Sequence, residues 1–230
     1  MRLDIIVPVF NEAATVVPAL TRLAPLRERG ARVFVVDGGS TDSTVALAAP
    51  LADRVLSASL GRSHQMNAGA RAALAQHEAD ALLFLHADTE LPPAADRLVA
   101  QALAGGRAWG RFDVRISGDS PWLAVVARLM NWRSRLTGIA TGDQAIFVER
   151  SAWIALGGYA PQALMEDIEF CRRARALSRP ACIAAPVSTS GRRWDRDGVW
   201  RTILLMWRLR AAYFFGADPE RLARRYRNTR

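Results

Sequence analysis

Along the first 90 residues, short apolar runs alternate with stretches of helical periodicity. Strands are predicted over 3–10, 33–37, 52–58 and 81–86, where mostly apolar residues follow one another. Between them, helices are predicted over 15–28, 44–51 and 65–77. This alternation is typical of an α/β fold, a three-layer α/β/α arrangement around a mostly parallel, Rossmann-like sheet with right-handed crossovers.

After residue 90 the pattern is less regular. Helical segments are predicted after Pro92-Pro93, over 123–135 and from about residue 165, and a strand over 144–148, while the stretch around Trp109, Phe112 and Ile116 shows no clear period. The final predicted element is a helix over 199–216. Its apolar face carries Trp200, Ile203, Leu204, Trp207, Ala211 and Phe214, and Arg201 and Arg208 lie on another face.

The composition indicates a globular protein that can bury a full core. The chain has 230 residues, of which 50% are hydrophobic. Its two cysteines, Cys171 and Cys182, form no CxxC motif and suit structural positions in a reducing compartment. The first apolar run is too short for a signal peptide and is interrupted by Asp4 and Pro8, so we expect a cytoplasmic protein.

The formal net charge of +9 is concentrated in the C-terminal part. Residues 1–170 carry 16 Arg against 18 acidic residues, whereas residues 171–230 carry 15 Arg against 4, and the chain contains no lysine. Because a nucleic-acid-binding protein would show a basic face across the whole domain, we expect no nucleic-acid partner.

Two interpretations of the tail helix remain open. It can lie in a membrane interface, because Trp, Phe and Arg suit that position. Alternatively Trp200, Trp207 and Phe214 can pack against the domain, and we favour this interpretation because the apolar face of a tail helix is more often core.

Polar residues follow three of the predicted strands. Asn11 and Glu12 come after the first strand, Asp37 ends the second, and the run LLFLHADTE continues from its buried strand into His86 and Asp88. One such residue is only a turn former. Because the carboxyl ends of parallel strands meet at one edge of a sheet, three of them together predict a ligand pocket.

Several common nucleotide sites are absent from the sequence. The first strand is followed by NEA rather than GxGxxG, and the chain has no GxxxxGK[ST], GxSxG or HExxH motif. A nucleotidyltransferase on a related sheet is the alternative enzyme class. It would carry a glycine-rich, Lys- or Arg-bearing loop after the first strand, which VPVFNEAAT lacks. A non-catalytic nucleotide or nucleic-acid binder using the basic tail is the alternative outside enzymes.

Six segments stand in a characteristic order. They are VPVFNE (7–12), VVDGGSTD (35–42), GRSHQMNAGA (61–70), FLHADT (84–89), GDQAIFV (142–148) and GGYAPQALMEDIEFCRR (157–173). In this order and spacing the chain, to about Trp194, resembles family-two glycosyltransferases of the inverting GT-A type. The resemblance implies a GT-A domain over 1–198, with a nucleotide-binding half to about residue 90 and an acceptor half after it, and a basic amphipathic extension over 199–230.

The resemblance implies transfer of a sugar from a nucleotide diphosphate sugar, with a UDP-sugar as the expected donor, to an acceptor hydroxyl that the sequence does not identify. The residues that it places at the nucleotide are Pro8, Asn11, Glu12, Asp37, Arg62, Asn67 and His86. Gly38 stands where many relatives have a second aspartate, which makes uracil recognition less secure. For Asp42 we expect helix capping instead.

The resemblance also implies the groups that perform the chemistry. His86-Ala87-Asp88 occupies the place of the DxD motif, so Asp88 would bind Mg²⁺ or Mn²⁺, while His86 would pack or contact the ribose rather than bind the metal. Asp167 would be the general base, with Glu166 raising its pKa by like-charge repulsion. Gly142, Asp143 and Gln144 would flank the acceptor, and Arg192, Arg193 and Trp194 would clamp the diphosphate.

Overall fold

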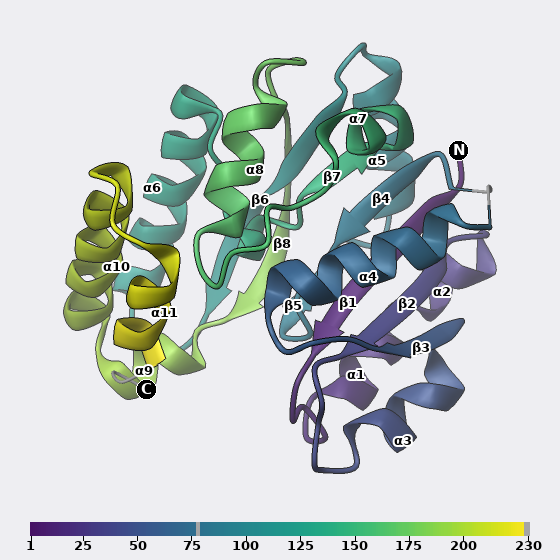
Figure 1. Ribbon diagram of the computed structural model, residues 1–230, viewed down its shortest axis with the longest axis horizontal. Coiled ribbons are helices and arrows are strands. Elements are labelled where there is room, and N and C mark those ends of the chain that lie inside the picture. Colours follow the sequence, from purple (N-terminus) through teal and green to yellow (C-terminus); the bar gives the residue numbers. More distant parts are fainter. Residues whose placement is uncertain (77–78, 228–230) are drawn as a thin grey trace.

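An eight-stranded sheet forms the centre of the molecule, with the strand order β3-β2-β1-β4-β7-β6-β8-β5 (Figure 1). The computed structural model describes residues 1–76 and 79–227, and the side chains of 1–76 and 79–226. The strands are β1 (Leu3–Val9), β2 (Arg32–Asp37), β3 (Arg54–Ser57), β4 (Ala81–Phe84), β5 (Thr89–Glu90), β6 (Trp109–Ser117), β7 (Phe147–Glu149) and β8 (Ala181–Ser190).

The sheet has a parallel part and a mixed part. Strands β3, β2, β1 and β4 are parallel, with Ile5 of β1 between Val33 of β2 and Leu83 of β4. Strand β7 is antiparallel to both β4 and β6, β6 is parallel to β8, and β5 is antiparallel to β8. The predicted strands correspond to β1, β2, β3, β4 and β7, and the predicted mostly parallel α/β sheet is confirmed.

Helices connect the strands. They are α1 (Val16–Thr21), α2 (Ala24–Glu28), α3 (Thr44–Ala48), α4 (Arg62–Leu74), α5 (Ala95–Ala104), α6 (Trp122–Thr137), α7 (Arg150–Leu156), α8 (Glu166–Ala174), α9 (Arg192–Asp197), α10 (Val199–Phe214) and α11 (Pro219–Arg227), with 3₁₀ turns η1 (Ala49–Leu51) and η2 (Gly142–Gln144). The helix predicted over 15–28 is two helices, because Pro25 lacks an N–H donor and cannot continue α1. The predicted end of the next long helix, His77, lies outside the described residues.

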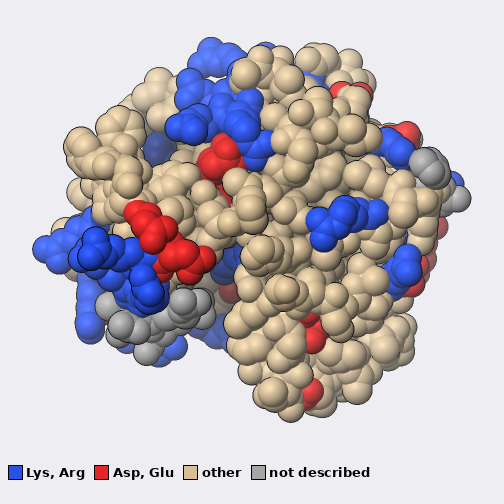
Figure 2. Space-filling model, viewed as in Figure 1, with Lys and Arg blue, Asp and Glu red and all other residues tan. Residues whose placement is uncertain are grey.

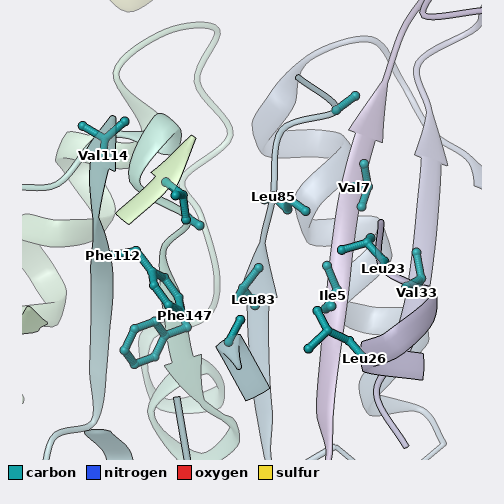
Figure 3. Packing of buried hydrophobic residues seen from close by; sticks show 14 of the residues in the cluster. Ile5, Val7, Leu23, Leu26, Val33, Leu83, Leu85, Phe112, Val114 and Phe147 are labelled. Atoms are coloured by element: carbon teal, nitrogen blue, oxygen red, sulfur yellow. The ribbon is translucent and has the colours of Figure 1, made fainter. Parts of the chain in front are cut away.

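Successive residues of a strand point to opposite faces of the sheet, and helices cover both faces. Ile5 belongs to a cluster with residues of α1, α2, α5 and α6 (Figure 3), whereas the next residue, Ile6, belongs to a cluster with residues of α4, α7 and α8. Gly69 allows α4 its close approach to the sheet, since a Cβ atom there would lie 2.6 Å from a methyl carbon of Ile6.

The tail helices pack around the segment that precedes α8. Met165 forms a buried cluster with Leu209 of α10 and Leu222 of α11. The favoured prediction that Trp200, Trp207 and Phe214 pack against the domain is wrong: they are 60%, 67% and 85% exposed. The helix turns a different face inward than expected, with Val199, Thr202 and Leu209 as its buried residues.

Large apolar side chains are exposed along α6 and α10, which lie side by side (Figure 1). We call this surface the α6–α10 face; it comprises Trp122, Val125, Leu129, Trp132 and Leu136 of α6, Trp200, Leu204, Trp207 and Phe214 of α10, and Phe215. The rings of Trp122 and Trp200 join the two helices, with centroids 5.2 Å apart. Neither these helices nor any other in the described part of the chain is long and apolar enough to cross a membrane.

Candidate active site

A first cavity of about 310 Å³ lies beyond the carboxyl ends of β1 and β4. Pro8 and Glu12 reach it from the end of β1, Arg62 from the start of α4, and His86 and Asp88 from the segment after β4. Glu166 of α8 and Tyr226 of α11 close its other side. The fold thus brings together residues from five separate segments. Glu12, His86 and Asp88 lie at strand ends, as the sequence pattern predicts, whereas Arg62, Glu166 and Tyr226 come from helices.

A second cavity of about 210 Å³ adjoins the first. The two share Arg62, His86, Asp88, Leu164, Glu166 and Tyr226 as lining residues. The second cavity adds Asp143 and Asp167, and the arginines Arg193 and Arg210. Carboxylates and guanidinium groups therefore converge here, an arrangement suited to anionic ligands and to proton transfer.

Asp167 is held by backbone donors. Its carboxylate accepts hydrogen bonds from the N–H of Gly142 at 3.0 Å and of Ile168 at 2.7 Å. Burial raises the pKa of Asp167, as does the charge of Asp143, while the two N–H groups and the charge of Arg62 act in the opposite direction without cancelling the effect. The result is an oriented carboxylate with increased basicity.

Glu166 is 6% exposed and lies at the border of the two cavities. Burial raises its pKa, the charge of Asp167 raises it further, and the charge of Arg62 partly opposes both. The sequence analysis expected repulsion from Glu166 to raise the pKa of Asp167. Instead the repulsion raises the pKa of Glu166, and burial is the larger cause for both carboxyl groups.

His86 is fixed between two partners. Its Nδ1 lies 3.3 Å from Oδ1 of Asp143, and a Cβ atom on Gly142 would come within 2.5 Å of its Nε2, so the ring is packed against that glycine. Burial would raise the pKa of Asp143, but the hydrogen bond from His86 and the charges of His86, Arg62 and Arg193 lower it. The His86 ring thus lies between the Asp143 carboxylate and the backbone of Gly142.

Asp88 carries an exposed carboxylate that faces both cavities. Among the described residues, its side chain accepts a single hydrogen bond, a long one of 3.4 Å from the hydroxyl of Thr89. Within the described residues, no cluster of three or more His, Cys, Asp or Glu side chains forms a complete metal site. A single free carboxylate beside a cavity fits Mg²⁺ or Mn²⁺, which keep several waters and take their other ligands from a bound phosphate.

Three residues predicted at the nucleotide bind other parts of the protein instead. The Asp37 carboxylate accepts hydrogen bonds from the N–H groups of Gly39 and Ser40, which close its own loop. The Asn11 side chain accepts from the N–H of Thr41 at 2.9 Å. Asn67 binds both the carbonyl and the N–H of Tyr159, and so fastens α4 to the loop before α8. None of the three lines the two cavities.

Of the residues expected on the acceptor side and at the diphosphate, some line the second cavity and others do not. Asp143, Arg193 and Trp194 line the second cavity, together with Gly142, whose N–H orients Asp167. Gln144 is fully buried and donates to the hydroxyl of Ser134, so its position is structural. Arg192 is exposed and faces a separate hollow on the other side of Asp88. Asp42, for which capping is expected, lies one residue before the N-cap Ser43 and accepts a hydrogen bond from the N–H of Thr44, the first residue of α3.

Sequence reasoning missed the contribution of the tail. Thr202, Met206 and Arg210 of α10 line the second cavity, and Ala223 and Tyr226 of α11 line the first. The guanidinium of Arg193 lies over the Tyr226 ring, 4.1 Å from its centroid. The residue spacing of a terminal helix does not indicate which part of the domain the helix packs against. That α10 and α11 line the two cavities is therefore visible only in the structure.

The family can now be stated from comparison with known proteins. The model of the family described as glycosyl transferase family 2 matches residues 4–153. The chain belongs to this family. The resemblance identified from the sequence motifs is therefore confirmed.

Curated proteins can be aligned with part of the chain. An undecaprenyl-phosphate 4-deoxy-4-formamido-L-arabinose transferase of Pseudomonas paraeruginosa (strain DSM 24068 / PA7) is 33% identical over 150 residues, 61% of this chain and 44% of that protein. The transferase of the same name from Pseudomonas aeruginosa (strain LESB58) is 32% identical over 149 residues, with the same shares. The chain thus spans less than half the length of these relatives.

Solved structures share the fold. TarS of Staphylococcus aureus (residues 1–349) has a TM-score of 0.65 at 16% identity, over 83% of this chain and 61% of that chain. The mannosyltransferase PcManGT of Pyrobaculum calidifontis, solved with GDP-Man and Mn²⁺, has a TM-score of 0.60 at 22% identity, over 82% and 56%. The predicted GT-A fold is therefore confirmed.

Proposed function

We propose that this protein transfers a sugar from a nucleotide diphosphate sugar to an acceptor hydroxyl, in one inverting displacement assisted by Mg²⁺ or Mn²⁺. The observation that carries the proposal is the placement of Asp88 and Asp167 on one cavity. Family membership and the fold support the reaction class. A carboxylate that binds the cation beside the diphosphate, here Asp88, and a basic carboxylate, here Asp167, are the two groups that such a displacement requires.

In the reaction, the acceptor oxygen forms a bond to the anomeric carbon while the bond from that carbon to the leaving diphosphate breaks. The proton of the acceptor hydroxyl passes to the carboxylate of Asp167. The raised pKa of Asp167 suits this task, because a general base works best when its pKa lies near the working pH. Asp167 is preferred to Glu166 as the base because two backbone N–H groups orient it.

The remaining residues would hold the donor. Pro8 and Glu12 would contact the nucleoside in the first cavity, and Arg62 and Arg193 would face the diphosphate. Asp88 would hold the divalent cation, which when bound neutralises charge that develops on the leaving diphosphate. His86 would position Asp143 at the base of the second cavity rather than contact the metal. Solved structures of the fold contain UDP-GlcNAc or GDP-Man, and we expect a UDP-sugar here.

Peripheral membrane contact belongs to the same proposal. The α6–α10 face exposes aromatic and aliphatic side chains on two neighbouring helices, more than isolated surface residues would account for. Arg201 and Arg208 lie on α10 beside its exposed residues. The name of the curated relatives includes a lipid-linked phosphate, undecaprenyl phosphate, which agrees with work at a membrane surface.

The test is a thermal-shift panel of nucleotide sugars on the full chain, with and without Mn²⁺. A donor at 100 times its Kd stabilises a protein by about 2.7 kcal/mol, which for a chain of this size corresponds to a Tm increase of about 5–10 °C. We expect one nucleotide class to give this increase, and Mn²⁺ to enlarge it. A panel in which every nucleotide sugar leaves the Tm unchanged contradicts the proposal.

A further inference from the structure

An apolar groove of about 320 Å³ runs between α6 and α10. Its walls are formed by Leu129, Met130 and Trp132 of α6 and by Ile203, Met206 and Trp207 of α10. Trp132 and Trp207 are 62% and 67% exposed, so the groove opens onto the α6–α10 face. A volume of this size is at the lower end of the range found for ligand sites.

The inner end of the groove joins the second cavity. Both are lined by Thr141, Asp143, Trp194, Met206 and Arg210. A molecule lying in the groove would therefore reach the cavity that contains Asp167 without entering through the first cavity. The groove is placed where the second substrate of a transfer reaction must arrive.

Two arginines line this apolar groove. Nε and Nη2 of Arg133 and Nε of Arg210 are buried, and among the described residues no atom accepts a hydrogen bond from them. Buried N–H groups are nearly always satisfied, so those left open in a pocket call for an acceptor that is not part of the chain. Guanidinium groups favour the paired oxygens of a phosphate.

The charge of these arginines is also uncompensated. Arg135, two residues from Arg133 on α6, binds the carboxylate of Asp113 at 2.7 and 2.8 Å. By contrast, Arg133 and Arg210 form no ion pair with a carboxylate in the described part of the chain. Burial lowers the pKa of Arg133, while the charge of Asp167 opposes that effect, which indicates that Arg133 lies within electrostatic reach of the catalytic carboxylate.

We propose that the groove between α6 and α10 is the acceptor site, and that the acceptor is a phosphate monoester on an apolar chain. The phosphate lies on Arg133 and Arg210, and the apolar chain of the ester lies along Trp132, Met206 and Trp207 toward the α6–α10 face. The acceptor hydroxyl is then the P–OH group of the monoanionic ester. Its oxygen forms the bond to the anomeric carbon as the bond to the leaving diphosphate breaks, and its proton passes to Asp167. This rests on the proposed glycosyl transfer, for which it names the class of acceptor. A neutral acceptor would leave the buried guanidinium groups unpaired, and a purely polar one would leave the apolar walls without a partner.

Binding of dodecyl phosphate to the full chain tests the proposal without requiring transfer. Calorimetry below the critical micelle concentration should show saturable binding to one site, with a change in tryptophan fluorescence, since Trp132, Trp194 and Trp207 line the groove. Dodecyl maltoside has the apolar dodecyl group without the phosphate, and glycerol phosphate has the phosphate without an apolar group. Both should bind at least tenfold more weakly.

Matched variants locate the site. Arg133→Gln and Arg210→Gln should each weaken dodecyl phosphate binding at least tenfold. Arg128→Gln and Arg208→Gln, on the same two helices but exposed to solvent, should leave it unchanged. UDP binding and the Tm of every variant report whether the donor site and the fold are intact, and Arg210→Gln alone decides the matter if Arg133→Gln does not fold.

The outcomes separate this proposal from the proposed function. Equal binding of dodecyl phosphate and dodecyl maltoside, or equal effects of the groove variants and their exposed controls, overturns the phosphate site. Glycerol phosphate binding as tightly as dodecyl phosphate overturns the apolar chain and assigns the site to a soluble ester. Dodecyl phosphate binding as described, in a protein that binds no nucleotide sugar, supports the groove and contradicts the transfer reaction.

Discussion

At the scale of single residues, strained backbone lies beside the site. In the described part of the chain, three residues other than glycine have positive φ: Asn11 (53°), Ala145 (46°) and Met165 (66°). Such conformations cost about 1–3 kcal/mol each and persist only where surrounding contacts enforce them. Met165 immediately precedes Glu166 and Asp167 and is buried against Leu209 and Leu222, so tail packing helps to fix the start of α8, where these two carboxylates lie.

Replacement of the proposed base separates chemistry from binding. Asp167→Asn keeps the size of the side chain and removes its basicity, so transfer should fall by about 10²-fold or more while donor affinity persists. The measurement is kcat alongside calorimetric donor binding. Glu166→Gln is the companion variant, and a larger loss of kcat there would move the base by one residue.

The carboxylate pair also makes stability depend on pH. Because folding raises the pKa of Glu166, the folded protein binds more protons than the unfolded one between the two pKa values, and its stability falls as the pH rises through that window. Glu166→Gln removes this loss, so its Tm at neutral pH should exceed that of the wild type. A gain of about 1 kcal/mol in the free energy of unfolding would raise the Tm by roughly 2–4 °C.

Melting curves from pH 4 to pH 8 check this expectation. The advantage of Glu166→Gln should shrink as the pH falls, since the wild-type carboxyl is then protonated as well. Glu149→Gln, at an exposed position outside both cavities, is the control and should show no such trend. A constant difference at all pH values would show that packing, not ionisation, distinguishes the variant.

Replacement of the proposed metal ligand should affect only the cation-dependent part of binding. In Asp88→Ala, Mn²⁺ should no longer raise the affinity for UDP, while the affinity without a cation is unchanged. Calorimetry with UDP, with and without Mn²⁺, measures both quantities, and the exposed Asp119→Ala serves as the control. An undiminished Mn²⁺ effect would exclude Asp88 as the ligand.

Sequence reasoning succeeds for Asp88, which follows a strand, and for Glu166 and Asp167, which the resemblance placed in the site: all three line the second cavity. Other strand ends are less informative, since the side chains of Asn11 and Asp37 bind nearby backbone instead. Sequence reasoning also fails for Asn67 and Gln144, whose side chains bind Tyr159 and Ser134. A polar side chain in a motif can form a hydrogen bond within the protein as readily as it binds a ligand. Which of the two it does depends on residues that are distant in sequence.

At the scale of elements, β8 shows why some strands escape prediction. Its sequence, ACIAAPVSTS, has few large apolar residues and contains Pro186. The pairing with β6 shifts at this point, from Phe112 opposite Ile183 to Asp113 opposite Pro186, and proline is tolerated at such an irregularity. In β6, by contrast, the alternation of Phe112, Val114 and Ile116 is a strand signal that the sequence analysis described as irregular.

The exposed element pair α6 and α10 carries a prediction of its own. If the α6–α10 face contacts a membrane, the full chain should float with anionic vesicles at low salt and detach as salt rises. Trp200→Ser with Trp207→Ser removes two large apolar side chains, each worth up to about 1.5–3 kcal/mol when buried. The double variant should therefore bind vesicles at least about tenfold more weakly.

An exposed residue elsewhere is the matched control for flotation. Ile154 of α7 is 58% exposed and lies outside the α6–α10 face, so Ile154→Ser should float like the wild type. Equal flotation of the double variant and this control would assign the vesicle binding to charge alone. A wild-type chain that does not float contradicts the membrane contact.

At the scale of the whole molecule, the basic charge gathers on the half of the protein that contains the second cavity. Basic side chains gather over the half that contains α8, α10 and α11, whereas the surface over α3 and α4 is largely uncharged (Figure 2). The net charge of the sequence predicts that this surface is basic, but it does not predict which arginines line a cavity. Part of the arginine excess lines cavities, with Arg193 and Arg210 in the second one, and is not simply a solvated face.

The meeting of the first cavity and the groove at the second cavity has a kinetic consequence. If the donor enters the first cavity and the acceptor enters the groove, as we propose, each substrate has its own entrance, and neither product needs to leave before the other substrate can bind. Initial rates measured against both substrates should therefore give intersecting double-reciprocal lines, the pattern of a ternary complex. Parallel lines would instead indicate a sugar held covalently on the protein between two half-reactions.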